Sequence, residues 1–183
     1  MCAPMTPTNY TPLALMAADE DDLRVVSAVL QDAVAKVGDL AFLPKARRFA
    51  LVANRFVWEE GASKARGPFS RVRVGVHLDD VTRVRSRKVD LGAREAVVSI
   101  LSVGFEAAPD EDASGGDASG GEGAGTVTLT LAGGGEIALV VDAINVMLED
   151  ISAPWRTQSR PAHDTPDAPG AAPGTASDAA GAA

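Results

Sequence analysis

Six basic side chains form the group of residues whose types and spacing suggest binding chemistry. They alternate with apolar residues in two neighbouring segments, "RVRVGVHL" at 71–78 and "VTRVRSRKV" at 81–89. Arginine suits this role because its planar guanidinium binds a carboxylate or a phosphate through two parallel hydrogen bonds. We therefore predict recognition of a polyanion by Arg71, Arg73, His77, Arg83, Arg85 and Arg87.

The sequence carries no comparable pattern for catalysis or metal binding. Its two histidines, His77 and His163, have no cysteine cluster beside them, and the single cysteine, Cys2, is next to the first residue. The glycine runs at 120–125 and 133–135 precede strand-like segments, whereas a phosphate-binding loop precedes a helix. We predict no catalytic residue, no metal and no cofactor; an enzyme whose site assembles only in space is an alternative.

Charge is distributed unevenly along the chain. Residues 45–94 contain thirteen basic and five acidic side chains, although the whole chain of 183 residues has a net charge of −8. The acidic average therefore hides a positive middle third, and the field of each face of the protein matters more than the average.

Period-two alternation predicts that the two arginine-bearing segments are strands, each with one apolar face. We expect them to form a hairpin with an irregular turn at Asp79 and Asp80, because one extra turn residue would place Val76 opposite Val84 and Arg73 opposite Arg87. All six basic side chains would then share one face. A solvated outer face over a valine core is the alternative to a binding face.

The rest of the chain reads mainly as antiparallel strands between two helices. We expect a strand and an amphipathic helix at 12–34, with Leu23, Val26 and Leu30 facing the core. Hairpins are predicted at 37–58 and 127–141, a central strand at 96–106, and a short closing helix at 143–151 with Asp142 as its N-cap.

These elements predict one α+β domain at 10–156, built mainly on an antiparallel meander with an N-terminal and a short C-terminal helix. Its element order looks like a pleckstrin-homology-like, partly open barrel, in which the last helix plugs one end. The acidic, Gly- and Ser-rich insert at 107–125 and the Pro-, Gly- and Ala-rich tail at 157–183 are predicted to be disordered.

Three segments together resemble a bacterial, alphaproteobacterial-type uncharacterised family, the domain of unknown function 2948. They are "LQDAVAKVGDLAFLPKARRFALVANRFVWE", "VHLDDVTRVRSRKVD" and "APWRTQSRPAHD". The resemblance covers roughly residues 12–164 apart from the insert, and it implies a bacterial cytosolic protein without assigning catalytic residues.

Our leading hypothesis is a non-enzymatic binding or scaffold module in the cytoplasm, whose arginine face engages an acidic protein segment or another polyanion. The insert carries five acidic residues and no basic one, so it could compete for the same face. Nucleic-acid binding is the alternative; it is less favoured because Phe69 is the only aromatic residue near the arginines, which leaves little for bases to stack on. No segment is typical of a membrane span or a signal peptide.

Overall fold

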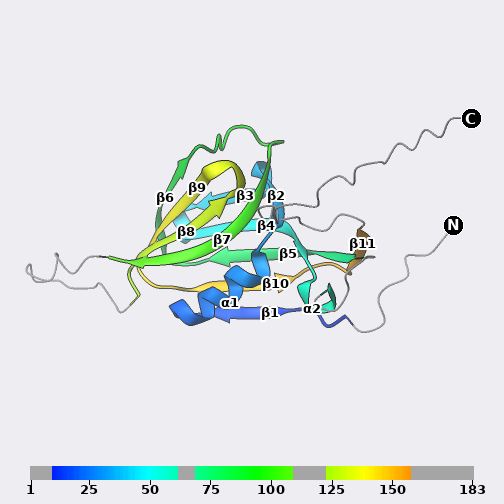
Figure 1. Cartoon of the computed structure of the whole chain (residues 1–183). Coiled ribbons are helices and arrows are strands. Elements are labelled where there is room, and N and C mark those ends of the chain that lie inside the picture. Colours follow the sequence, from blue (N-terminus) through cyan, green and yellow to red (C-terminus); the bar gives the residue numbers. More distant parts are fainter. Residues whose placement is uncertain (1–9, 62–68, 109–122, 158–183) are drawn as a thin grey trace, which may run out of the picture.

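The computed structural model describes residues 10–61, 69–108 and 123–157 (Figure 1). Most of the predicted disordered insert and tail, at 109–122 and 158–183, lies outside these residues. Within them, strands dominate and α1 is the one long helix. The elements are β1 Ala14–Ala17, α1 Glu20–Leu30, β2 Ala33–Lys36, β3 Leu40–Leu43, β4 Arg48–Phe56, α2 Trp58–Gly61, β5 Phe69–Leu78, β6 Val81–Arg87, β7 Val97–Ala107, β8 Gly125–Leu131, β9 Gly135–Val141, β10 Val146–Asp150 and β11 Trp155–Thr157.

The strands form one antiparallel sheet, and its order is β1-β10-β5-β4-β2-β7-β8-β9-β6. Strand β11 pairs with β5, and β3 pairs with β4. The sheet curls so that β6, β9 and β8 lie over β4 and β5, but it does not close into a barrel (Figure 1). Helix α1 packs against β7, β1 and β4 and covers the open side of the core. The α+β class predicted from the sequence is confirmed.

Helix α1 begins and packs as its sequence predicts. The Asp19 side chain accepts a hydrogen bond from the backbone N–H of Asp22 at 2.8 Å, which satisfies one of the free donors at the helix start. Leu23, Val26 and Leu30 are each 1% exposed and face the sheet. Their helical spacing therefore predicted the buried face correctly.

The predicted hairpins flanking the arginine segments are confirmed. β3 pairs with β4, so that Leu40 lies opposite Leu51, and β8 pairs with β9, so that Val127 lies opposite Leu139. Strand β7 is an interior strand, as expected, because it lies between β2 and β8.

The predicted hairpin of the two arginine segments is wrong. β5 lies between β4 and β10, whereas β6 pairs with β9. Val76 is opposite Leu51 and Leu148 instead of Val84, and Arg87 is opposite Glu136 instead of Arg73. Backbone hydrogen bonds from Asp79 to Asn145 and from Val81 to Arg47 direct the chain away from β5. Alternation along a strand identifies its faces but does not identify its neighbours.

The predicted closing helix at 143–151 is also wrong, because Val146–Asp150 forms β10 between β1 and β5. Val146, Leu148 and Asp150 are buried while Met147 and Glu149 are exposed, which is a period of two. A short apolar run fits either period, and the free edges of β1 and β5 decide between them here. No helix follows β9 in the described residues, so the helix-plugged, pleckstrin-homology-like arrangement does not apply.

We expect a disulfide to test the β6–β9 pairing directly. In a Cys2→Ser background, cysteines replacing Arg85 and Ala138, which lie opposite each other, should form an intramolecular bond on oxidation, because facing Cα atoms in antiparallel strands are within disulfide range. Cysteines replacing Arg73 and Arg87 should not. Mass spectrometry of the oxidised, non-reduced protein measures both, and a bond only in the second pair would restore the predicted hairpin.

Candidate functional site

The structure divides the six predicted binding residues into two groups. Arg71, Arg73 and His77 lie on the outer face of β5, and Arg83, Arg85 and Arg87 lie on the outer face of β6. Since β4, β2, β7, β8 and β9 lie between β5 and β6 in the sheet, the six do not form one continuous arginine face.

Two members of the β5 group have partners within the chain. Arg71 is partly buried, which lowers its pKa, and its Nη1 donates to the backbone oxygen of Asn54 at 3.1 Å. His77 Nε2 lies 3.7 Å from Asp79 Oδ2. The guanidinium of Arg73, by contrast, makes no hydrogen bond or ion pair with any residue in the described ranges.

In the β6 group, Arg83 and Arg85 are exposed and have no ion-pair partner among the described residues. Arg87 is different: its Nη2 lies 2.5 Å from Glu136 Oε1, and this hydrogen bond raises the pKa of the guanidinium. Two neighbouring arginines on one strand therefore remain available to an external anion.

The surface beside Arg83 and Arg85 is built from small side chains. Arg83 is opposite Val140 on β9, which is in turn opposite Thr126 on β8. Arg85 is opposite Ala138. Of these neighbours only Thr126 carries a hydroxyl group, and none offers an aromatic ring for a base to stack on.

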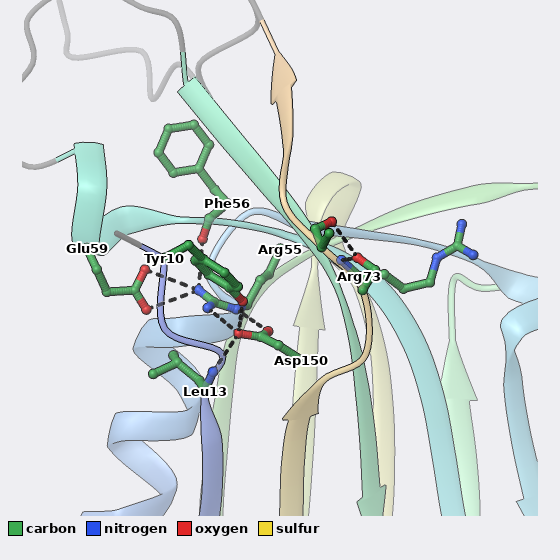
Figure 2. Close-up of polar contacts among 9 residues, drawn as sticks. Tyr10, Leu13, Arg55, Phe56, Glu59, Arg73 and Asp150 are labelled. Carbon is green, nitrogen blue, oxygen red and sulfur yellow. Dashed lines mark hydrogen bonds and ion pairs between the residues drawn. The ribbon is translucent and has the colours of Figure 1, made fainter. Parts of the chain in front are cut away.

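The strongest polar cluster was missed by sequence reasoning (Figure 2). Arg55 on β4 and Asp150 on β10 form a two-point ion pair, Nε to Oδ1 at 2.8 Å and Nη2 to Oδ2 at 2.7 Å. Their side chains are 1% and 0% exposed. Tyr10 OH and the backbone N–H of Leu13 also donate to Asp150, the latter at 2.8 Å.

The rest of the Arg55 guanidinium is also occupied. Its Nη1 donates to the backbone oxygen of Phe56 and to the Glu59 carboxylate, both at 3.2 Å. No buried side-chain nitrogen or oxygen in the described part of the chain lacks a hydrogen-bond partner. Each buried side-chain nitrogen and oxygen of this cluster thus has a partner inside the protein, as is typical of a structural ion pair.

Each half of this ion pair interrupts the apolar face of its strand. Arg55 follows Phe49, Leu51 and Ala53 in the buried phase of β4. Asp150 follows Leu148 in the buried phase of β10. A charged residue in the apolar phase of each of two strands is the sequence signal for such a pair, but the second half is visible only once residues 146–150 are read as a strand.

Burial alone would raise the pKa of Asp150, but hydrogen bonds from Arg55, Tyr10 and Leu13 outweigh it and hold the pKa below its ordinary value. Burial, together with the nearby Asp150 carboxylate, raises the pKa of the Tyr10 phenol. Both groups therefore keep their charge states at neutral pH, with Asp150 ionised and Tyr10 neutral.

The described residues contain no group of three or more His, Cys, Asp or Glu side chains placed to hold a metal ion. Among the same residues, no helix combines the length and the apolar character needed to cross a membrane.

We expect Asp150→Ala to lower the free energy of unfolding by about 3–5 kcal/mol, because it leaves the Arg55 charge buried without its partner. Replacing the pair together, as Arg55→Met with Asp150→Leu, should recover most of that loss. Urea unfolding followed by circular dichroism measures both, with exposed Arg85→Ala as a control that changes stability by no more than about 0.5 kcal/mol. Equal losses in the single and double variants would contradict this role.

The lowered pKa of Asp150 also predicts a pH dependence. A carboxyl whose pKa is lower in the folded state stabilises the fold above its unfolded pKa, about 4, and this contribution is lost as the pH falls through the folded pKa. Acidification from pH 5 to pH 2 should therefore destabilise the natural chain more than the Arg55→Met/Asp150→Leu variant. Parallel slopes of unfolding free energy against pH would contradict the assignment.

Comparisons with known proteins place the chain in a family without adding an activity. No curated protein and no solved structure matches the chain. A family match does cover residues 13–163, which include every described strand and α1. Because this match spans most of the chain, the protein belongs to the family described as "Protein of unknown function (DUF2948)".

Proposed function

We propose that this protein is a non-enzymatic binding module of the bacterial cytoplasm, and that it recognises an extended, acidic protein segment along β6. The observation that carries the proposal is the pair Arg83 and Arg85, two exposed arginines that have no ion-pair partner among the described residues. They lie on a strand with one edge that no other described strand pairs with. A single cysteine in the whole chain is in keeping with a reducing compartment.

The free edge of β6 supports strand addition as the binding mode. β6 pairs with β9 on one side, and no strand in the described part of the chain pairs with its other side. An exposed edge offers backbone N–H and C=O groups to an extended peptide, which adds to the sheet as a further strand. The backbone then supplies affinity, and the side chains select the peptide.

The inner face beside this edge is open to solvent. Ser86 is opposite Ile137, and Val84 is opposite Leu139; both partners on β9 are 0% exposed. Ser86 is nevertheless exposed and Val84 is only partly buried. An added strand could therefore place apolar side chains beside Val84 while its alternate side chains face the arginines.

The charges on β6 define the partner. Like charges at neighbouring positions repel, so an acidic strand that brings carboxylates to Arg83 and Arg85 relieves a repulsion as well as forming ion pairs. The same arginines oppose pairing with a basic strand or with another copy of β6. An alternating sequence of acidic and apolar residues has the matching pattern.

We expect a peptide of alternating Glu and Val to bind the full chain, and its Lys–Val counterpart not to bind. Arg85→Glu should weaken binding at least about tenfold, because it replaces a charge-assisted hydrogen bond with a repulsion. Arg156→Glu on β11 is the matched control, since it makes the same charge change at an exposed position away from β6. Fluorescence anisotropy with both labelled peptides, at low and high salt, measures binding to the natural chain and to each variant.

Two outcomes would contradict the proposal. Equal losses in Arg85→Glu and Arg156→Glu would mean that general charge attraction, and not β6, causes the binding. Tighter binding of a single-stranded oligonucleotide than of the acidic peptide, with a logarithmic salt slope of roughly 0.7 per phosphate contacted, would reassign β6 to nucleic acid.

A further inference from the structure

A hollow of about 200 Å³ lies on the outer face of the sheet, where β2, β4, β5 and the start of β7 meet. It forms because β2 pairs with β4 at a single position, Val34 opposite Asn54, before the chain turns at Val37–Asp39 toward β3. Because β2 and β4 pair at this one position only, their neighbouring side chains are not brought into contact by backbone hydrogen bonds. The hollow is thus a product of the sheet's branching at β4.

The walls of the hollow combine apolar and polar groups. Val34, Val52 and Val97 supply the apolar surface. Arg73 and Asn54 supply the donors, and they lie directly opposite each other on β5 and β4. Facing residues in antiparallel strands have Cβ atoms about 4.5–5.5 Å apart, so one small group can reach both side chains.

Neither donor is used by the described part of the protein. Arg73 has no ion-pair partner there, and the side-chain amide of Asn54 makes no hydrogen bond there, although its backbone oxygen accepts one from Arg71. Lys36, a third polar group of the hollow, is already paired with Glu95 at 2.7 Å. The unneutralised charge in the hollow that can attract an anion is therefore that of Arg73.

The backbone of Arg73 is held firmly in place. Its N–H donates to Ser152 Oγ at 3.0 Å, and its carbonyl oxygen accepts from the N–H of Ile151 at 2.8 Å. Figure 2 shows the side chain of Arg73 extending away from the Arg55–Asp150 cluster, so Arg55 and Arg73 lie in different environments. A guanidinium on a fixed strand loses less conformational freedom on binding than one on a loop.

We propose that this hollow binds a small aliphatic carboxylate, with the carboxylate held by Arg73 and Asn54 and the aliphatic body against the three valines. Arginine binds a carboxylate through two parallel hydrogen bonds, and the amide of Asn54 adds a third donor. The volume of about 200 Å³ leaves room for a short aliphatic acid.

Asp39 also lines the hollow, and its carboxylate narrows the class of ligand further. Its carboxylate repels a second acidic group on the ligand and can accept a hydrogen bond from a hydroxyl group. A monocarboxylate therefore fits better than a dicarboxylate of the same length. This site is separate from β6, and its assignment does not depend on the function proposed above.

The test is a nuclear magnetic resonance titration of the ¹⁵N-labelled full chain with pentanoate. We expect saturable shifts confined to the β2–β4–β5 region, with Kd on the order of 1 mM or below. Pentanamide, which has the same size and no charge, should bind at least about tenfold more weakly, and glutarate should bind more weakly than pentanoate. Equal binding of pentanoate and pentanamide, or no saturable shift with pentanoate, would overturn the proposal.

Substitutions then locate the site. Arg73→Ala should weaken pentanoate binding at least about tenfold and Asn54→Ala about threefold, whereas Arg156→Ala should leave it unchanged. Arg73→Lys keeps the charge and loses the two-point geometry, so its affinity should fall between those of the natural chain and Arg73→Ala. The amide spectrum of each variant verifies the fold in the same experiment. Unchanged affinity in a folded Arg73→Ala variant would overturn the proposal, even if the acidic peptide still binds β6.

Discussion

The buried ion pair between Arg55 and Asp150 is the interaction on which the arrangement of the sheet depends. It joins β4 to β10 on the inner face, and through Tyr10 and Leu13 it also fixes the chain leading into β1. Two buried charges cost several kcal/mol in desolvation each, so they persist only where hydrogen bonds satisfy them completely. Here every buried side-chain nitrogen and oxygen in the described residues has a hydrogen-bond partner, and a polar cluster closes this end of an otherwise apolar core.

The order of strands around this pair explains why the arginines of the middle third do not act together. With β10 and β4 beside β5, the chain leaves β5 at Leu78 and crosses to the far edge of the sheet, where β6 joins β9. One basic stretch of sequence thus contributes to two surfaces. Arg73 faces a hollow of about 200 Å³, while Arg83 and Arg85 face solvent beside a free edge.

Hydrogen bonds and ion pairs within the chain determine which of the six basic side chains can bind a ligand. Arg71, His77 and Arg87 have partners within the chain, whereas Arg73, Arg83 and Arg85 have no side-chain partner in the part of the chain that the structure describes. Counting basic residues in the sequence overestimates the available charge, because a paired guanidinium attracts an external anion weakly. The two proposed sites rest on the unpaired members only, and each is small enough for a single substitution to test it.

Local patterns alone determined much of this protein: the capped helix α1, the β3–β4 and β8–β9 hairpins, the interior strand β7 and the outward direction of all six basic side chains. Each depends on neighbours within a few residues, where periodicity and turn chemistry act. The tertiary structure alone decided the partners of β5 and β6, the strand at Val146–Asp150 and the burial of Arg55. These depend on hydrogen bonds and ion pairs between residues up to 140 positions apart, and such contacts leave no regular spacing in the sequence.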